Sequence, residues 1–192
     1  MKATVERATL LKCLGHIQSV VERRNTIPIL SNVLIEAREQ GLRLMATDLD
    51  LQVVETIPAA IDVNGATTVS AHTLFDIVRK LPDGSQVELA TSGEKMTVVA
   101  GRSRFSLATL KRDDFPVIAE TELPTRFTLT AGQLKLLIDA TRFAISTEET
   151  RYYLNGIYVH AVNGKLRGVA TDGHRLARIE MDLPDGAADM PG

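Results

Sequence analysis

The sequence predicts an α+β fold built from repeated β-α-β-β-β half-units, with helices on one face of antiparallel sheets. Three observations lead to this prediction. They are a long internal repeat, a shorter repeat inside its first copy, and apolar patterns that alternate between helical and strand periods. Together they indicate a chain assembled from equivalent pieces.

The long repeat relates the two ends of the chain. The tripeptide Ala-Thr-Asp occurs at 46–48 and again at 170–172, which sets an offset of 124 residues (171 − 47). The same offset runs without a gap back to Thr4, which meets Thr128. Other matched positions are Leu10 with Leu134, Leu30 with Leu154, and Leu42-Arg43 with Leu166-Arg167. A gapless register that preserves the apolar pattern predicts two copies of one domain.

The shorter repeat divides the first copy into two halves. Residues 4–14 align with 68–78 at an offset of 64 (68 − 4), and residues 33–51 align with 87–105 at an offset of 54 (87 − 33). The difference between the two offsets falls in the loop around the stretch ERRNTIPI. Each domain is therefore expected to contain two similar halves.

Each half is expected to begin with a short strand that leads into a helix. The helices are predicted at about 9–23 and about 71–81, with Thr9 and Thr73 as capping or first-turn residues. Alternation of period two then predicts three strands in each half. These strands lie at about 29–37, 41–47 and 50–57 in the first half, and at about 86–91, 95–100 and 103–108 in the second.

The domain boundaries follow from the repeats. Residues 1–120 are expected to form a complete first domain, and residues 128–192 the first half of a second. The connection holds two prolines and many charges between 109 and 126, with the linker proper at 121–127. A third helix is predicted at about 131–145. Its inward residues are expected to be Leu134, Leu137, Ile138 and Ile145.

Composition excludes several classes of protein. The net charge is −2 and the hydrophobic content is 44%, which is typical of a globular chain and gives no support for strong nucleic-acid binding. Cys13 is the single cysteine, so no internal disulfide can form. No apolar run approaches ~18 residues, so no membrane span is expected. A cytoplasmic location is the expectation that follows.

The apolar faces of the first two predicted helices are Leu10, Leu14, Ile17 and Val21 on the first, and Leu74, Ile77, Val78 and Leu81 on the second. Basic residues lie opposite these faces. Lys12 falls there on the first helix, and Arg79 and Lys80 fall there on the second. For any single helix this pattern is that of an ordinary solvated face. A wall that faces phosphates is the functional alternative, because Lys and Arg on helices attract a nucleic-acid backbone without reading its bases.

Two acidic stretches are candidates for chemistry. Asp48 and Asp50 form a D-x-D pattern, and Asp172 lies beside His174 and Arg175. Because Asp172 repeats Asp48 where the first copy has no histidine, the simpler interpretation is a residue that caps a turn. We therefore predict no catalytic residues, no metal site and no cofactor, and an enzyme such as a carboxylate- or His-dependent hydrolase is the weaker alternative.

Four stretches carry a family resemblance. TIPILSNVLIE, GRSRFSL, RYYLNGIYV and ATDGHRLA closely resemble the bacterial sliding clamps, the beta subunits of DNA polymerase III. The resemblance implies a DNA-clamp fold in a ring-shaped homodimer with three similar domains per protomer. It also implies a non-catalytic processivity factor for DNA replication. Its implied partners are double-stranded DNA, the replicative polymerase catalytic subunit, the clamp loader and other proteins that carry a clamp-binding motif.

The resemblance also implies residues that contact DNA. Arg24 matches the family's DNA-contacting loop arginine, and Tyr152 and Tyr153 belong to a second region that approaches DNA. Lys12, Arg79 and Lys80 are added as lining residues from the helix pattern above. The loop before the two tyrosines reads Thr147-Glu148-Glu149, and two carboxylates there should weaken contact with phosphates.

A partner-peptide pocket and a ring interface are implied as well. The matching pocket positions are Arg151, Leu154, Thr171, Gly173, His174, Arg175 and Leu176. The ring-interface positions are Arg102, Arg104 and Phe105. With the third domain absent from the 192 residues, the chain is not expected to close the ring as the family does. A short peptide-binding adaptor is the remaining alternative.

Overall fold

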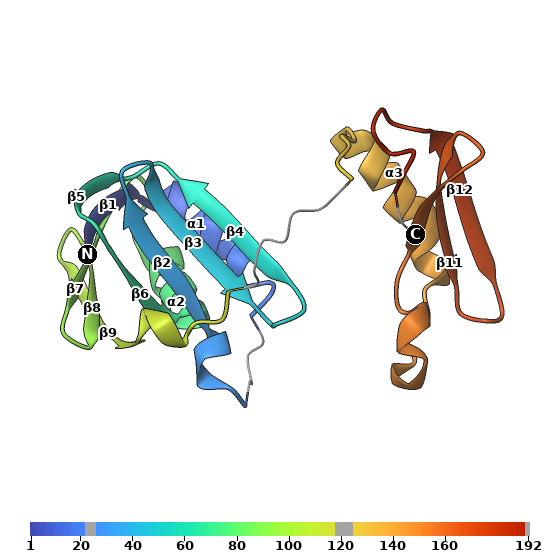
Figure 1. Cartoon of the computed structure of the whole chain (residues 1–192). Helices are drawn as coiled ribbons and strands as arrows, with labels where there is room; N and C mark the ends of the chain where they lie inside the picture. The colour runs from blue at the N-terminus through green and yellow to red at the C-terminus, as the bar shows by residue number, and fades with distance from the viewer. Residues whose placement is uncertain (22–25, 118–124, 191–192) are drawn as a thin grey trace. The chain divides into compact units, whose positions relative to one another are not determined.

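The computed structural model describes residues 1–21, 26–117 and 125–190. The chain divides into two compact units, Met1–Ala119 (unit 1) and Glu120–Gly192 (unit 2). Arg24 lies outside the described residues. Figure 1 shows the elements of each unit.

Unit 1 contains two β-α-β-β-β half-units in sequence, as predicted. The first half is β1 (Lys2–Glu6), α1 (Arg7–Ile17), β2 (Asn32–Arg38), β3 (Gly41–Thr47) and β4 (Gln52–Ile57), with a 3-10 helix η1 (Pro28–Ser31) before β2. The second half is β6 (Gly65–Ser70), α2 (Ala71–Lys80), β7 (Gln86–Ser92), β8 (Lys95–Ala100) and β9 (Ser103–Leu110), followed by η2 (Arg112–Asp114). A further strand, β5 (Ala60–Val63), was not predicted.

The two halves of unit 1 exchange their first strands. The antiparallel sheet has the order β4-β3-β2-β6-β9-β8-β7-β1-β5. Strand β1 of the first half pairs with β7 of the second, and β6 of the second half pairs with β2 of the first. The sheet is therefore continuous across both halves.

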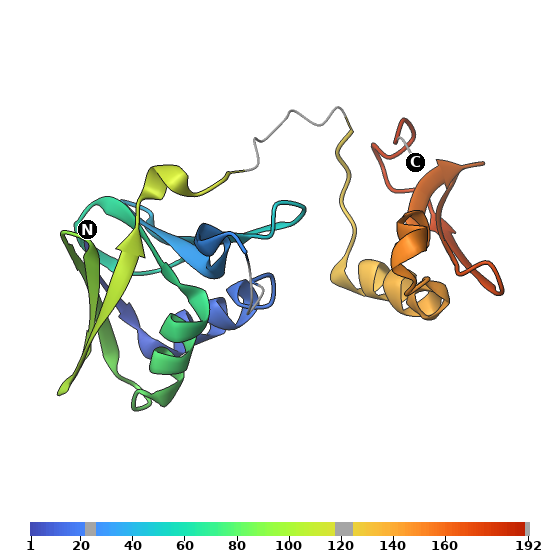
Figure 2. The same cartoon turned by 90° about the horizontal axis from the view of Figure 1, so that it is seen from below.

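Both helices cover one face of this sheet and pack against each other (Figure 2). Their apolar residues form the centre of the core, where Leu10 and Leu14 of α1 and Leu74 and Val78 of α2 have no exposed surface. The predicted inward faces of these two helices are confirmed. Burial of this apolar surface is the main source of stability of the unit.

Side chains from neighbouring residues cap the two helices. The Glu6 carboxylate accepts a hydrogen bond from the Thr9 backbone amide (2.7 Å), and Ser70 Oγ accepts one from Thr73 (3.4 Å). Thr9 and Thr73 are therefore first-turn residues rather than caps. The capping residues are Glu6 for α1 and Ser70 for α2. They are separated by the repeat offset of 64 (70 − 6), so they occupy equivalent positions in the two halves.

Helix α1 ends at Ile17, well before the predicted end near residue 23. Val20 and Val21 are β-branched and are poor helix formers. Val21 is buried, and its carbonyl oxygen lies 2.9 Å from His72 Nε2 at the start of α2. A tertiary contact thus replaces the continuation of the helix.

Arg7 links the two halves at the other end of the helix pair. Its Nε donates to the Val78 carbonyl oxygen (3.1 Å) and its Nη2 donates to that of Arg79 (2.8 Å). It also forms an ion pair with Asp83. The guanidinium therefore satisfies carbonyl groups that the end of α2 leaves free.

Glu36 on the opposite face of the sheet is a buried carboxylate that the sequence did not predict. It accepts hydrogen bonds from Arg38 (2.7 Å) and Arg43 (2.9 Å), and Arg112 of η2 lies 3.7 Å away. Burial acts to raise the pKa of Glu36, but the hydrogen bonds from Arg43 and Arg38 outweigh it and hold the pKa below its ordinary value. The cluster anchors η2 on the sheet.

Unit 2 contains the same elements as one half-unit, except for the first strand. They are α3 (Ala131–Thr141), η3 (Arg142–Ala144), η4 (Glu149–Leu154), β10 (Tyr158–Val162), β11 (Lys165–Thr171) and β12 (Leu176–Asp182). The strands form an antiparallel sheet in the order β10-β11-β12, and α3 packs on β11 and β12. Residues 125–130, which match β1, form no strand.

The predicted inward face of α3 is partly wrong. Leu137 is buried and Ile145 is partly buried, but Leu134 is 48% exposed and Ile138 is 38% exposed. No second helix covers them among the described residues of unit 2, as α2 covers α1 in unit 1. The helix also ends earlier than predicted, where the Thr141 hydroxyl donates to the Leu137 carbonyl oxygen (2.7 Å).

Candidate functional site

The turn between β11 and β12 is held by hydrogen bonds that the first copy of the repeat shares. The Asp172 carboxylate accepts bonds from the backbone amides of His174 and Arg175 (both 2.9 Å). In the first copy Asp48 accepts the corresponding bonds from Asp50 (3.0 Å) and Leu51 (2.7 Å). The interpretation of both aspartates as turn-capping residues is confirmed.

Asp172 is poorly suited to acid–base chemistry at neutral pH. Hydrogen bonds from the backbone amides of Arg175 and His174 lower its pKa to about 2. Arg175 Nε also lies 2.9 Å from the second carboxylate oxygen. The carboxylate is therefore ionised and occupied as an acceptor within its own turn.

The absence of a side chain at Gly173 leaves space for the Arg151 side chain. The positive φ of the turn does not by itself require a glycine. The φ of Gly173 is 88°, but Leu49 at the equivalent repeat position has a φ of 83°, so a side chain can adopt this turn. A Cβ on Gly173 would lie 3.1 Å from Arg151 Nη1. That nitrogen donates to the Asp172 carbonyl oxygen (3.2 Å). The glycine thus lets Arg151 reach the turn.

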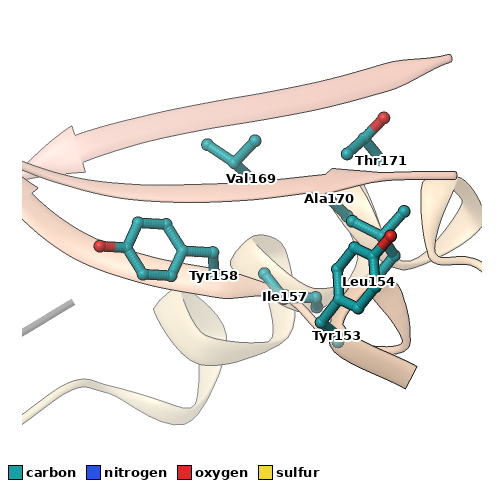
Figure 3. Close-up of a pocket in the computed structure, with 8 residues that line it drawn as sticks. Tyr153, Leu154, Ile157, Tyr158, Val169, Ala170 and Thr171 are labelled. Carbon is teal, nitrogen blue, oxygen red and sulfur yellow. The ribbon is translucent and has the colours of Figure 1, made fainter. Parts of the chain in front are cut away.

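A pocket of about 270 Å³ lies at the start of this turn, between η4 and the ends of β10 and β11. Leu154 and Thr171, two of the expected pocket residues, line it together with Tyr153 (Figure 3). The other lining residues are Gly156, Ile157, Tyr158, Val169 and Ala170. These residues could not be singled out from the sequence, because their alternating apolar pattern is the same as that of any half-buried strand.

The remaining expected pocket residues lie around the same turn. Thr171 pairs with Leu176 across β11 and β12, and Leu176 is 65% exposed. Arg175 lies over the exposed ring of Phe143, with its guanidinium carbon 5.8 Å from the ring centroid. His174 is exposed on the loop. The structure therefore brings the seven residues together, next to apolar surface that could hold a peptide side chain.

Tyr152 and Tyr153 are exposed neighbours on η4. Their rings meet edge to face with centroids 5.9 Å apart. Glu148, just before η4, pairs with Arg151 Nε (3.0 Å), and Glu149 is the first residue of η4. Both glutamates are exposed. One of the two carboxylates expected to repel phosphates is thus partly neutralised by a neighbouring arginine.

The expected cationic residues of unit 1 lie on its helices. Lys12 on α1 and Lys80 on α2 are exposed. Arg79 lies over the Phe75 ring at 5.6 Å and is 3.1 Å from Asp76. Two of the three residues thus present a charge with no acidic partner among their described contacts.

The expected ring-interface residues lie in the first part of β9 and in the turn before it, where β9 is paired on one side only. Arg102 is in the turn before β9, and Arg104 and Phe105 are in the strand, opposite Val99 and Val98 of β8. In the described part of the chain β9 pairs with β6 only at Thr109 and Leu110. The rest of β9 is therefore an open edge toward that side.

Cys13 is the single cysteine and is buried in the core of unit 1. Burial raises the pKa of the Cys13 thiol to about 12, with the nearby Glu55 charge acting in the same direction. Over residues 1–21, 26–117 and 125–190, no three His, Cys, Asp or Glu side chains are grouped so as to hold a metal ion. No helix within those ranges is long and apolar enough to span a membrane.

The paired half-units, the helices on one sheet face and the continuous antiparallel sheet are those of the DNA-clamp class of α+β folds. Residues 1–119 match the family described as DNA polymerase III beta subunit, N-terminal domain, and residues 128–191 match the central domain of the same subunit. The chain belongs to the DNA polymerase III beta subunit family.

Curated relatives and solved structures agree with this assignment. The Beta sliding clamp of Caulobacter vibrioides is 58% identical over 100% of this chain and 53% of its own length. That of Escherichia coli K12 is 43% identical over 95% of this chain and 50% of its own length. A Caulobacter crescentus beta sliding clamp structure matches with a TM-score of 0.96 at 58% identity, covering 100% of this chain and 52% of that one. A Bartonella birtlesii DnaN sliding clamp bound to griselimycin matches with a TM-score of 0.97 at 53% identity, with the same coverage. The chain spans about half the length of the relatives it matches.

Proposed function

We propose that this chain supplies the first part of a DNA sliding clamp, a non-catalytic scaffold that encircles duplex DNA and tethers the replicative polymerase. The observation that carries the proposal is the family match over both units, at up to 58% identity to named Beta sliding clamps. In this proposal the protein acts in the cytoplasm, and the complete clamp is a ring-shaped homodimer.

The charge distribution supports a surface that slides on DNA. The chain carries a net charge of −2, so it is not a strongly cationic DNA-binding protein. Lys12, Arg79 and Lys80 lie on the helices of unit 1, where phosphates would meet long, exposed cationic side chains. We assign these three residues, with Arg24, Tyr152 and Tyr153, to DNA contact. Because the contacts are few and exposed, they are expected to hold the backbone weakly and without sequence preference.

The pocket in unit 2 supports a role in binding partner peptides. Leu154 and Thr171 line an apolar hollow, while Arg151, Gly173 and His174 lie beside it on or next to the turn. With Arg175 and Leu176, these residues are assigned to one half of a peptide site for the polymerase catalytic subunit and the clamp loader. Such a site would combine apolar anchoring with polar groups that fix the peptide's orientation.

The open edge of β9 supports a role in ring closure. A free sheet edge is a surface on which a strand of another protomer can add. Arg102, Arg104 and Phe105 lie on this edge, and we assign them to the protomer interface.

A hybrid clamp tests the proposal. The matched half of the Caulobacter vibrioides clamp would be replaced with this chain, and retention of the hybrid on nicked circular DNA would be measured by gel filtration. We expect the hybrid to be retained and then lost after the DNA is linearised. A triple variant, Lys12→Glu, Arg79→Glu and Lys80→Glu, should reduce retention about tenfold or more, whereas Lys95→Glu on β8 should leave it unchanged.

The same hybrid separates the peptide pocket from DNA binding. His174→Ala with Arg175→Ala should abolish binding of a fluorescent polymerase C-terminal peptide while retention on circular DNA stays normal. A folded, dimeric hybrid that slips off circular DNA would contradict the proposed function. Normal peptide binding by the double variant would remove only the pocket assignment.

A further inference from the structure

A phenylalanine from the connection after β9 fills a small apolar cluster on unit 1. Phe115 directly follows η2 and is 5% exposed. It packs with Leu34 and Met45, which are paired on β2 and β3, and with Ile29 and Leu30 of η1. All five residues lie outside the main core cluster that includes the inward faces of α1 and α2. The cluster is therefore a separate packing site, and the connection supplies one of its members.

The residues that surround Phe115 occupy the same repeat positions as the pocket of unit 2. At the offset of 124 (171 − 47), their counterparts are Tyr153, Leu154, Tyr158 and Val169. All four counterparts line the unit 2 pocket (Figure 3). The walls come from η1, β2 and β3 in unit 1 and from the matched elements η4, β10 and β11 in unit 2. The cluster is thus the unit 1 form of that pocket, and Phe115 occupies it.

Side chains hold residues 111–117 on unit 1. Among the described residues, the backbone hydrogen bonds of this segment are those of its own turn, which ends with the bond from the Phe115 amide to the Arg112 carbonyl oxygen (3.0 Å). Pro116 then favours an extended backbone at Phe115, where φ is −81° and ψ is 120°. One aromatic ring and one guanidinium therefore carry the attachment, as anchor residues do when a short peptide binds a protein.

The buried carboxylate beside the cluster stays compensated without this segment. Glu36 accepts its two short hydrogen bonds from Arg38 (2.7 Å) and Arg43 (2.9 Å), which both lie on the sheet. Arg112 is the more distant partner at 3.7 Å, and its side chain is 49% exposed. Release of the segment would therefore leave no unpaired buried charge, which is the usual reason that such a pair resists separation.

We propose that unit 1 carries a second peptide site, and that residues 111–117 are its internal occupant. The site takes a short peptide with an aromatic residue for the apolar cluster and a cation three residues earlier for Glu36. This inference rests on the assignment of the matched pocket in unit 2 to partner peptides. The walls of the site are preformed, because β2 and β3 are each paired on both sides and η1 begins with Pro28. Unit 1 is closed to partner peptides while Phe115 occupies its site.

A peptide added in trans tests the site. Phe115→Ala empties the cluster, and a synthetic peptide with the sequence of residues 110–117, LKRDDFPV, supplies the missing ring. In an NMR titration the variant of the 192-residue chain should bind this peptide at least about tenfold more tightly than the wild type, because in the wild type the tethered segment competes. The amide signals of Leu30 and Met45 should shift. Phe115→Leu, which refills the cluster, should exclude the peptide as the wild type does.

Three controls locate the binding. The same peptide with alanine in place of its phenylalanine should not bind, since the ring is the main anchor. Leu30→Asp added to Phe115→Ala should abolish binding, because it places a charge in the wall of the cluster. His174→Ala with Arg175→Ala, added to Phe115→Ala, should leave binding unchanged. Failure of the unit 2 assignment would appear in the peptide assay of the hybrid clamp and would leave this titration as it is.

The fold of the variant is checked in the main core. Amide exchange at Leu10 and Leu74 should be unchanged by Phe115→Ala, because the ring lies outside that core. A folded Phe115→Ala chain that binds no peptide overturns the proposal. Equal binding by the wild type, or shifts in the unit 2 pocket without shifts at Leu30 and Met45, overturns it too.

The wild-type chain supplies a second measurement that needs no truncation. An excess of the peptide should speed amide exchange at Phe115, because the displaced segment loses its turn. Exchange at Phe115 that stays unchanged under this excess would show that the segment is a fixed part of unit 1 and would overturn the proposal.

Discussion

Helices α1 and α3 occupy the same position in the two copies of the repeat, yet one is buried and the other is open. Leu10 and Leu14 of α1 have no exposed surface, whereas Leu134 is 48% exposed and Ile138 is 38% exposed at the matched positions of α3. The difference is that α1 packs on α2, which has no counterpart among the described elements of unit 2. The apolar pattern of a repeated helix therefore shows which residues can be buried. Whether they are buried depends on whether a second helix packs against that face.

The largest expected difference is between Leu14→Ala and Ile138→Ala. Removing Leu14 leaves a cavity in a closed core and should lower the free energy of unfolding of unit 1 by about 3 kcal/mol. Ile138→Ala should lower that of unit 2 by less than about 1 kcal/mol, because solvent already reaches the side chain. Amide hydrogen exchange in each unit, at protein concentrations that keep the chain monomeric, measures both values. Equal losses would show that the two helices are equally covered in solution.

Glu36 has no carboxylate counterpart in unit 2, where the matched residue is His160 (36 + 124). Glu36→Gln removes the charge that Arg38 and Arg43 share and should lower the free energy of unfolding of unit 1 by about 1–3 kcal/mol. Urea unfolding followed at probes in unit 1 measures the change. Glu180→Gln, which alters the exposed pair with Arg167 in unit 2, is the control and should have a smaller effect.

Acid should separate the Glu36→Gln variant from the wild type. The pKa of folded Glu36 lies below the ordinary value of 4.5, so its contribution to stability is fully present above that pH. The contribution is lost as the pH falls through the lowered pKa of the folded state. The Glu36→Gln variant should therefore lose less stability than the wild type below pH 4.5. Parallel acid unfolding curves for the two proteins would mean that the carboxylate is not held as described.

The smallest expected difference is between the two turns. Gly173→Ala should lower the free energy of unfolding of unit 2 by about 1 kcal/mol, because φ is positive there and Arg151 must shift. Leu49→Gly at the matched position should change the free energy of unfolding of unit 1 by less than about 0.5 kcal/mol. Glycine relieves the strained φ of the folded turn, but it also increases the conformational freedom of the unfolded chain, and the two effects oppose each other. Thermal unfolding monitored in each unit measures these shifts. A neutral Gly173→Ala would show that Arg151 adjusts without cost.

Much of unit 1 could be predicted because the apolar periodicity of its sequence agrees with the packing of its helices and strands. The inward residues of α1 and α2, and the order of helices and strands along each half-unit, follow from apolar periodicity and the repeat. The order of the strands within the sheet was not predicted. The position at which α1 ends could not be predicted, because the contact between Val21 and His72 joins residues far apart in the sequence. Glu36 was missed for a similar reason. A charged residue at an alternating strand position is typical of a solvent face, and only the fold brings Arg43 and Arg112 to it.

In the candidate site, the turn between β11 and β12 could be predicted from the sequence, but most of the pocket lining could not. The repeated Thr-Asp pair identified the turn, since the same side-chain bonds recur at Asp48 and Asp172. The role of Gly173 depends on Arg151, which approaches from 21 residues earlier. The pocket lining from Ile157 and Val169 depends on how β10 and β11 meet η4, which no local pattern specifies.

The exchange of first strands in unit 1 has a consequence for how this unit folds. The N-terminal strand β1 finds its partner β7 only after α2 has been synthesised, and Arg7 completes α2 from the opposite half. Neither half can satisfy its own sheet edge or helix end alone, so a stable intermediate with one half formed is not expected. Refolding of unit 1 should be a single, comparatively slow step, dominated by contacts between distant parts of the chain.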